Sequence, residues 1–440
     1  MKNANLNKFV IDSFSKYYEQ VSSGSSGKLS RTEISPPEKK NLIDYNQLEK
    51  PVSSPLEKLV VIKLNGGLGT SMGLTKVKSL LRVKGDYNFL DIIARQILYL
   101  REKSKKNVPL LFMNSFSTRD DSLSYLEKYP KLQLPEIPLD FLQNKFPKIK
   151  QSDLSPLRNR NENLNWNPPG HGEIYLVLMI SGVLDQLLDS GFEFAFISNS
   201  DNLGAVVDEK ILNYFALNKI PFMMEVCKRS QKDRKGGHLA QTKDGRLLLR
   251  EIAQCPEQEI SEFQNIKKYQ YFNTNNLWVN LKALKQELIK NDYLLPLSLI
   301  INPKEVEAEK IYQIETAMGA AISVFENSKA VVVNRDRFAP VKKTNDLLVI
   351  WSDAYKLQQD YKLVLDENLK EPPKINLDER YYRTYVQLED HFKDGIPSLK
   401  KCRDLKISAD VFFGKNVEII GNVQISKKGK IENQEINSDM

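Results

Sequence analysis

The stretch from Leu59 to Ser79, LVVIKLNGGLGTSMGLTKVKS, constrains the fold more than any other part of the chain. Its first six residues are almost continuously apolar, which is typical of a parallel strand covered on both faces. Four glycines then fall within eight residues, at positions 66, 67, 69 and 73. Such a cluster allows positive φ angles and lets backbone N–H groups approach a bulky anion. The stretch therefore predicts a buried strand that leads into a phosphate-binding loop.

Two familiar glycine motifs fit this loop badly. A Walker A loop needs a lysine directly after a glycine, and neither Lys76 nor Lys78 follows one. Read from Gly67, the spacing is one residue longer than the dinucleotide fingerprint, whose ribose-binding acid would have to be Asp86 or Asp91. On the loop alone, a glycine-rich turn that only connects a strand to a helix remains an alternative.

Composition narrows the class of protein and of partner. With 440 residues, 41% of them hydrophobic and 27% charged, the chain is long enough for two or three packed domains. The net charge of +8 comes from 64 basic and 56 acidic residues spread along the chain without an arginine-rich arm, so we expect no nucleic-acid partner. The N-terminus lacks an apolar signal region, and no run approaches the ~20 apolar residues of a membrane span. We therefore expect a cytoplasmic protein that binds no membrane.

Cysteine and histidine are too few and too scattered to build a metal centre. Cys227, Cys255 and Cys402 are odd in number and far apart, which argues against disulfides and zinc and predicts buried thiols. Only three histidines are present, at positions 171, 238 and 391. Any metal should therefore be held by oxygen ligands.

Hydrophobic periodicity predicts an α/β succession of elements. Helices are expected over 6–18, 88–103, 173–188, 206–217 and 311–325, and strands over 59–64, 109–113, 194–197, 222–226, 247–249 and 331–333. Residues 22–40 are rich in Ser, Gly, Pro and charge, which predicts a mobile linker after the first helix. Residues 132–167 hold several prolines and little periodicity, which predicts a long excursion that carries functional loop residues.

An aspartate follows one of the predicted strands. The strand over 194–197 runs into SNSDN, so Asp201 lies just beyond its carboxyl end, where open α/β sheets bind ligands. A carboxylate there can hold Mg²⁺, which binds one or two carboxylates together with substrate phosphates and several waters. The alternative from local sequence is that Asp201 caps the helix over 206–217.

Two further segments are candidates for ligand contacts. Residues 272–278, FNTNNLW, are unusually rich in amides for a segment bounded by apolar residues. Such a row of amides and hydroxyls suits a polyol, although a hydrogen-bonded turn explains it equally well. The segment PVKKT places Lys342 and its neighbour on a predicted loop.

The last sixty residues change period. Apolar residues recur every six positions in two registers, Leu405, Val411, Val417 and Val423 in one and Ile407, Phe413, Ile419 and Ile425 in the other. This hexapeptide pattern favours coils of a parallel β-helix over a plain β-meander. Because such coils stack readily on a neighbour, the pattern is compatible with a homo-oligomer formed through this region.

Taken together, the motifs resemble the UTP–glucose-1-phosphate uridylyltransferase family, also called UDP-glucose pyrophosphorylases, from about Pro55 to Val423. The resemblance depends on eight strings in a fixed order: LNGGLGTSMG, MNSFST, PPGHGE, SNSDNLGA, KGGHL, EIAQ, FNTNNLW and PVKKTNDLL. It implies a Rossmann-like nucleotidyltransferase core of the glycosyltransferase-A type with a C-terminal left-handed parallel β-helix. We accordingly expect an N-terminal helix and flexible linker over 1–50, the catalytic domain over 51–375 and the β-helix over 376–440.

The resemblance also implies the roles of individual residues. The residues implied to hold the nucleotide are Leu64, Asn65, Gly66, Gly67, Lys78, Gln143, Gly170 and Asp201, with Gln143 and Gly170 at the uracil. Those implied to contact the sugar phosphate are His171, Asn199, Ser200, Gly237, Glu251, Asn275, Asn276 and Leu277. Asp201 would also carry Mg²⁺, and Lys78 and Lys342 would act as catalytic residues by neutralising the triphosphate.

The implied reaction is attack by glucose 1-phosphate on the α-phosphorus of UTP, which gives UDP-glucose and pyrophosphate. Such a transfer needs positioning and charge neutralisation more than a side-chain nucleophile. Two alternatives are a retaining glycosyltransferase of similar core fold and a nucleotide-sugar-binding protein without catalysis. Pyrophosphate-dependent formation of UTP from UDP-glucose would distinguish the first of these from the uridylyltransferase.

Overall fold

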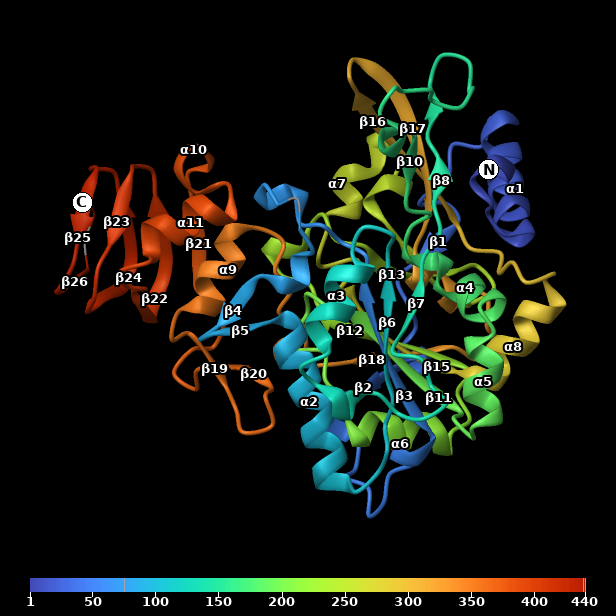
Figure 1. The fold of residues 1–440 in the computed structure, drawn as a ribbon, viewed down its shortest axis with the longest axis horizontal. Helices are drawn as coiled ribbons and strands as arrows, with labels where there is room; N and C mark the ends of the chain where they lie inside the picture. The colour runs from blue at the N-terminus through green and yellow to red at the C-terminus, as the bar shows by residue number, and fades with distance from the viewer. Residues whose placement is uncertain (75, 438, 440) are drawn as a thin grey trace.

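The computed structural model describes residues 1–74, 76–437 and 439, and its fold is mixed α/β around a large central sheet (Figure 1). The main path of this sheet runs, in spatial order, through β2 (Leu42–Asp44), β18 (Lys329–Val332), β12 (Phe222–Lys228), β15 (Tyr271–Asn280), β11 (Phe194–Asn199), β3 (Leu59–Asn65), β6 (Leu110–Asn114) and β7 (Asp140–Leu142). Three further strands join it from the side: β1 (Ile34–Ser35), β13 (His238–Thr242) and β14 (Leu247–Arg250).

The sheet is mixed because one strand runs against its neighbours. Strand β15 is antiparallel to β11 and β12, while the other pairs along the main path are parallel. Strands β3 and β11 are adjacent and in register, with Leu64 opposite Asn199. The glycine loop after β3 and the aspartate loop after β11 therefore leave the sheet at the same edge.

Helices cover the sheet and the edges of the molecule (Figure 1). Their bounds are α1 (Lys8–Ser22), α2 (Phe89–Ser104), α3 (Arg119–Leu126), α4 (Ile174–Ile180), α5 (Val183–Asp189), α6 (Glu209–Leu217), α7 (Ile260–Phe263), α8 (Leu281–Lys290), α9 (Thr344–Trp351), α10 (Glu379–Tyr382) and α11 (Tyr385–Phe392). Helices α2, α6 and α9 share one hydrophobic core with one face of the sheet, and α4, α5 and α8 share a second core with the other face. Strand β3 contributes Leu59 and Val61 to the first core and Val60 and Ile62 to the second. The prediction of a strand buried on both faces is therefore confirmed.

Two predicted helices differ from the structure. The helix expected over 173–188 is broken into α4 and α5 at Gly182, whose φ of +77° is not helical. The helix expected over 311–325 is wrong, because strand β17 (Glu309–Thr316) occupies its first part and a 3₁₀ helix (Met318–Ser323) most of the rest. Strand β17 pairs along its whole length with β16 (Leu299–Val306), and this hairpin also pairs with β9 (Ile149–Lys150). Three short antiparallel pairs lie outside the main sheet: β4 (Arg82–Lys84) with β5 (Tyr87–Asn88), β8 (Phe146–Pro147) with β10 (Trp166–Asn167), and β19 (Tyr355–Leu357) with β20 (Leu363–Leu365).

The N-terminal segment lies against the main body. The predicted first helix is confirmed as α1, whose buried residues include Val10 and Phe14, and it packs on Phe146 in a small separate core. The segment that follows contacts the sheet: strand β1 pairs with β13, and Lys28 Nζ donates to the carbonyl of Ala253 at 2.8 Å.

The C-terminal part is built from parallel strands, consistent with a β-helix. One sheet contains β21 (Lys374–Leu377), β22 (Ser398–Ile407), β24 (Val417–Ile425) and β26 (Gln434–Ile436), and a second contains β23 (Val411–Phe413) and β25 (Gly429–Ile431). All of these strand pairs are parallel, and both predicted apolar registers are buried. This part lies on the opposite side of the molecule from helix α1 (Figure 1).

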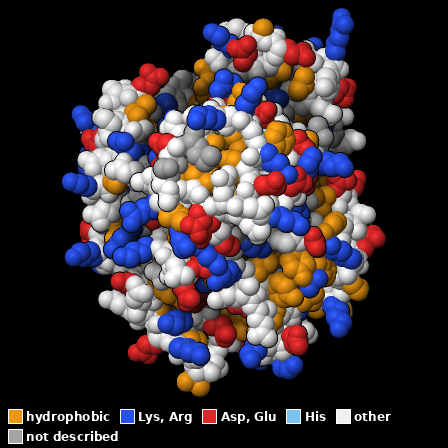
Figure 2. Space-filling view, turned by 90° about the vertical axis from the view of Figure 1, so that its left-hand side faces the viewer, with side chains coloured by type: hydrophobic (Ala, Val, Ile, Leu, Met, Phe, Trp, Pro, Cys, Tyr) orange, Lys and Arg blue, Asp and Glu red, His pale blue; other side chains and the backbone are white. Residues whose placement is uncertain are grey.

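Charged side chains of both signs are mixed on the surface. Figure 2 shows basic side chains interspersed with acidic ones on the face seen there, without a large patch of one sign. All three cysteines are buried free thiols, as predicted. In the part of the chain that the structure describes, no single helix is long and apolar enough to cross a membrane, and one bent pair, His171–Ile180 with Val183–Asp189, meets that test only by combined length and composition.

Candidate active site

A cavity of about 320 Å³ opens where strands β3 and β11 end. It is lined by Leu64, Asn65, Gly66, Gly67, Lys78, Ser79, Met113, Gln143, Pro168, Gly170, His171, Asn199, Ser200, Asp201 and Glu315. These residues come from segments that are far apart in the sequence, yet the sheet brings their loops to one edge. The cavity therefore contains every residue predicted to hold the nucleotide.

The glycine loop forms one wall of this cavity. At Gly66 a side chain would be tightly placed, since an added Cβ would lie 3.1 Å from Gln143 Oε1, whereas Gly67 faces open space. The amide of Lys78 donates to the carbonyl of Gly67 at 3.1 Å, which closes the loop. The side chain of Asn65 is buried and donates to Asn114 Oδ1 at 2.8 Å and to Ser122 Oγ at 2.9 Å. Asn65 and the glycines therefore offer backbone groups to a ligand, which is what close binding of an anion requires.

Gln143 and Gly170 form a second part of the cavity wall, next to Gly66. Gln143 Nε2 donates to the carbonyl of Gly170 at 3.0 Å, which fixes the orientation of the amide. Gly170 has a φ of +81°, and an added Cβ would clash with the carbonyl oxygen of Thr316. Only glycine fits here, because the loop before helix α4 passes directly over strand β17.

His171 lines the cavity as a neutral imidazole. Burial lowers the pKa of His171 to about 4. Its Nδ1 accepts the amide proton of Met318 at 2.8 Å, so the ring proton resides on Nε2. A fixed tautomer with Nε2 as donor can bind an oxygen of a ligand.

Asp201 and Lys78 meet on the floor of the cavity. Lys78 Nζ and Asp201 Oδ2 form an ion pair at 2.5 Å, with side chains 16% and 22% exposed. The other oxygen, Asp201 Oδ1, is buried and has no hydrogen-bond partner within the described residues. Asp201 is not a helix cap: the N-cap of α6 is Asp208, whose Oδ1 accepts from the amides of Lys210 and Ile211.

The carboxylate of Asp201 suits a cation such as Mg²⁺ that also binds oxygen atoms of a ligand. Outside positions 75, 438 and 440, no group of three or more His, Cys, Asp or Glu side chains could hold a metal ion. A Mg²⁺ ion does not need such a group, since it binds one or two carboxylates and takes phosphate oxygens and waters for the rest. The unpartnered Asp201 Oδ1 fits this mode of binding.

Lys342 reaches the site on a loop that is attached to the Asp201 loop. The amide of Val341 donates to the carbonyl of Asp201 at 3.2 Å, and Asn202 forms a β-bridge with Pro340. The Lys342 side chain is exposed, and its positive charge lowers the pKa of Glu251, which burial raises more strongly. Glu251 in turn lies against Gly237, where an added Cβ would be 2.5 Å from the carboxylate. Gly237, Glu251 and Lys342 thus form a second group that does not line the cavity itself.

The amide-rich segment is part of strand β15, so the turn interpretation is wrong. A register shift interrupts its pairing with β12, and Asn275 there has a φ of +59° and accepts from Asn273 Nδ2 at 2.8 Å. The next two residues point away from the cavity into the protein interior. Asn276 is fully buried and donates to Glu225 Oε2 at 3.0 Å, and Leu277 lies in the hydrophobic core. The side chains of Asn276 and Leu277 therefore do not line the cavity, and of the predicted sugar contacts only His171, Asn199 and Ser200 do.

Four cavity residues were not singled out by the sequence: Ser79, Met113, Pro168 and Glu315. Met113 and Pro168 begin two of the recognised strings, and Ser79 directly follows Lys78, so these three positions were available. Glu315 was hidden because its segment was assigned to a helix, whereas it belongs to strand β17, next to Gly170.

The fold and the cavity together define a class of protein: a nucleotide-binding α/β enzyme with a glycine loop, a carboxylate and a lysine at one sheet edge. Comparison with known proteins identifies the family. The family model described as "UTP--glucose-1-phosphate uridylyltransferase" matches residues 11–420. The uridylyltransferase of Musa acuminata is 41% identical over 442 residues, which cover 98% of this chain and 93% of that protein. That of Hordeum vulgare is 42% identical, over 93% of this chain and 87% of its own length.

Solved structures agree with this assignment. A mutant of UDP-glucose pyrophosphorylase from Leishmania major in complex with UDP-glucose superposes with a TM-score of 0.93 at 39% identity, covering 100% of this chain and 97% of the other. A Trypanosoma brucei structure titled a UDP-glucose phosphorylase gives a TM-score of 0.90 at 41% identity, with 99% and 97% covered. The chain belongs to the UTP–glucose-1-phosphate uridylyltransferase family, the UDP-glucose pyrophosphorylases.

Proposed function

We propose that the cavity at the ends of β3 and β11 is where this chain carries out the reaction of its family. The chain is a nucleotidyltransferase, a UTP–glucose-1-phosphate uridylyltransferase that produces UDP-glucose. The observation that supports this location best is the gathering of the glycine loop, Gln143, His171, Lys78 and Asp201 in one cavity. These groups offer a base-reading amide, phosphate-binding backbone and charged groups within the length of one nucleotide.

In this proposal UTP lies across the cavity with its base at Gln143 and Gly170. Uracil presents carbonyl oxygens and one N–H, which can pair with an amide that is held in one orientation and with backbone groups. The phosphates extend along Leu64, Asn65, Gly66 and Gly67, which line the cavity. Gly67, with open space beside its Cα, is where the backbone can come closest to a phosphate.

Asp201 is the residue proposed to hold Mg²⁺, together with the phosphates of UTP. Bound there, Mg²⁺ would neutralise negative charge on the phosphates of the nucleotide. Lys78, which pairs with Asp201 in the structure, lies where its ammonium group can contact a phosphate oxygen. Lys342, on the adjoining loop, is proposed to bring a second ammonium group to the triphosphate from outside the cavity lining.

The sugar phosphate is proposed to lie between the cavity and the Glu251 group. His171 Nε2, Asn199 and Ser200 offer donors to its phosphate, and Ser200 Oγ is buried without a protein partner among the described residues. The glucose ring would then reach Gly237, Glu251 and Asn275, where a carboxylate and an amide can bind hydroxyl groups.

The chemistry needs no covalent intermediate with the protein. A phosphate oxygen of glucose 1-phosphate attacks the α-phosphorus of UTP in line, the bond to the bridging oxygen breaks, and pyrophosphate leaves. The protein contributes position and positive charge, which are the main requirements of phosphoryl-type transfer. Because one phosphoanhydride-type bond replaces another of similar energy, the reaction is reversible.

The remaining part of the proposal concerns architecture. We assign residues 51–375 to a Rossmann-like nucleotidyltransferase domain of the glycosyltransferase-A type and 376–440 to a left-handed parallel β-helix, with 1–50 as an N-terminal appendage. Supporting the β-helix, Leu405 pairs with Val423 and Val411 with Gly429, so successive coils are offset by three hexapeptides.

The test is a pyrophosphate-release assay of the purified protein with UTP, Mg²⁺ and a panel of sugar 1-phosphates. Glucose 1-phosphate should give the highest kcat/KM, and release should stop when Mg²⁺ is chelated. Release that needs no sugar phosphate, or sugar transfer from UDP-glucose to an added acceptor, would contradict the proposal.

A further inference from the structure

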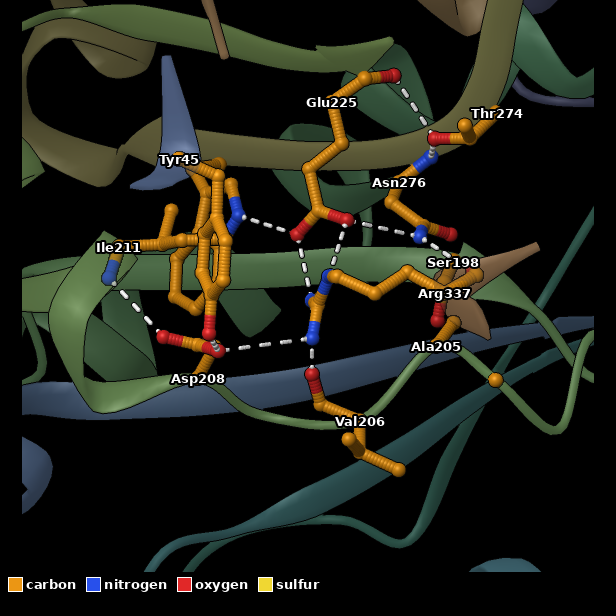
Figure 3. A network of polar contacts seen from close by, with 12 residues as sticks. Tyr45, Ser198, Ala205, Val206, Asp208, Ile211, Glu225, Thr274, Asn276 and Arg337 are labelled. Carbon is orange, nitrogen blue, oxygen red and sulfur yellow. Dashed lines mark hydrogen bonds and ion pairs between the residues drawn. The ribbon is translucent and has the colours of Figure 1, made fainter. Parts of the chain in front are cut away.

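Behind the cavity lies a buried polar network centred on Glu225, which the proposed chemistry does not use (Figure 3). Glu225, on strand β12, is 0% exposed, and Arg337 is 3% exposed. Arg337 donates from Nε to Glu225 Oε2 at 2.7 Å and from Nη2 to Glu225 Oε1 at 2.6 Å. Trp278 Nε1 donates to the same carboxylate at 3.0 Å. A fully buried bidentate pair with this many partners holds its members in one geometry.

Arg337 belongs to the segment that leads to Lys342, and it reaches across to the loop that carries Asp201. Its Nη2 also donates to the carbonyl of Val206 at 2.9 Å (Figure 3). Buried Lys63, on strand β3, donates to Ser198 Oγ at the end of strand β11 at 2.8 Å and to the carbonyl of Ala205 at 2.7 Å. The Asp201 loop is therefore held at both ends by hydrogen bonds from buried basic side chains.

Asn202, next to Asp201, makes the reciprocal connection. It is 2% exposed, and its Nδ2 donates to the carbonyl of Arg337 at 3.1 Å and to Asn276 Oδ1 at 3.2 Å. Its Oδ1 accepts from the amide of Ala339 at 2.9 Å and from that of Gly204 at 3.3 Å. All four hydrogen-bonding positions of the amide are thus occupied. Two of them join the Asp201 loop to the backbone that leads to Lys342.

The backbones of the two loops also touch directly. At Gly204 an added Cβ would clash with the carbonyl oxygen of Asp336, so only glycine allows this approach. The hydrogen bond from the amide of Val341 to the carbonyl of Asp201 joins the same two loops nearer the cavity. Side chain and backbone contacts therefore fasten the two loops together along their length.

We propose that Asn202 and Arg337 are positioning residues that set the distance between Asp201 and Lys342. The inference depends on the proposed function, since it assigns the network a role only if these two charged groups act on one substrate. Neither side chain lines the cavity, so they act through the loops. A displacement of about 1 Å between groups that act on one transition state reduces the rate by up to about a hundredfold.

The test compares Asn202→Ala with Trp278→Phe. Both substitutions remove buried hydrogen bonds of the same network. The Nε1 donor of Trp278, however, bonds to Glu225 and to neither loop, so Trp278→Phe serves as the matched control. For each variant and the wild type we would measure the melting temperature, kcat, KM for UTP, the Mg²⁺ concentration at half-maximal rate, and hydrogen exchange of residues 199–206 and 335–342.

Both variants should melt below the wild type. Asn202→Ala should in addition lose about tenfold or more in kcat, need more Mg²⁺, and exchange faster in both loops, while KM for UTP stays within about threefold because the base site is intact. Trp278→Phe should keep kcat and magnesium dependence. Asn202→Ser, which keeps a shorter polar group, should lie between Asn202→Ala and the wild type, and it replaces Asn202→Ala should that variant not fold.

The outcomes separate the two proposals. A wild-type protein without uridylyl transfer would contradict the proposed function itself. An active wild type whose Asn202 variants behave like Trp278→Phe, with unchanged kcat and faster exchange in neither loop, would overturn the positioning role.

Discussion

Replacing Asp201 by asparagine should separate the catalytic role of this carboxylate from any role in folding. The change keeps the shape of the side chain and removes its charge, and the cap of helix α6 is unaffected because it is Asp208. The ion pair with Lys78, whose side chains are 16% and 22% exposed, becomes a hydrogen bond from Lys78 Nζ to the asparagine Oδ1, at a cost of about 1 kcal/mol. The second carboxylate oxygen, Oδ1, has no hydrogen-bond partner within the described residues, so no further contact is lost there. For a chain of this length, the melting temperature should fall by only ~1–2 °C.

The activity should respond on a different scale. Removing a positioned charge from a phosphoryl-transfer site costs ~3–4 kcal/mol in the transition state, or ~10²–10³ in rate. An amide oxygen is also a poorer ligand for Mg²⁺ than a carboxylate, so the Mg²⁺ concentration at half-maximal rate should rise.

The assay is a magnesium titration of initial rates beside a thermal melt of each protein. Asp185→Asn is the matched control, since it also neutralises an aspartate that pairs with a lysine, Lys285 at 2.8 Å, but on helix α5 outside the cavity. It should keep wild-type rates. If Asp201→Asn shows wild-type activity and wild-type magnesium dependence, the assignment of the metal to Asp201 is refuted.

The same contacts support four further predictions. Gly170→Ala should lower both the melting temperature and the affinity for UTP, because φ at this residue is +81° and the new Cβ would clash with Thr316. An unchanged dissociation constant for UTP in titration calorimetry would contradict this. ATP and GTP should be used at least about tenfold less efficiently than UTP, judged by kcat/KM, because a purine edge leaves the polar groups at Gln143 unpaired. Burial raises the pKa of Glu173 to about 8, so the contribution of the protonated carboxyl to stability is complete below about pH 4.5 and is lost as the pH rises through 8. The melting temperature of Glu173→Gln relative to that of the wild type should therefore rise from acid to alkaline pH. Parallel curves of melting temperature against pH for the two proteins would exclude this. Removal of residues from Leu399 onward should expose apolar faces of the C-terminal coils and produce aggregation or a new oligomeric state in light scattering, whereas an unchanged soluble species would count against the coils.

The parts of the fold that were predictable are those in which local pattern and tertiary environment agree. The apolar run of β3 is buried, and Gly69 and Gly73 in the loop after it have positive φ angles, as the sequence predicts. Asp201 was placed correctly beyond strand β11 because strand and loop are adjacent in sequence. The hexapeptide registers at the C-terminus were visible because each coil repeats the same burial requirement.

The errors arose where distant segments decide the structure. Ile311 and Ile314 are spaced as on a helix, but pairing with β16 makes their segment a strand and places Glu315 in the cavity. In strand β15, alternation turns Asn276 toward Glu225, which lies 51 positions earlier in the chain and gives no signal in the local sequence. The motif strings therefore identified loops that line the cavity, whereas the directions of individual side chains depend on how the strands pair.

The reverse reaction, followed by phosphorus NMR, is the direct test of uridylyl transfer in this cavity. Purified protein is incubated with UDP-glucose, pyrophosphate and Mg²⁺, and we expect UTP and glucose 1-phosphate to appear together, in equal amounts and only when pyrophosphate is present. Formation of UDP and a transferred sugar, or no change in a protein that still binds UDP-glucose, would contradict uridylyl transfer in this cavity.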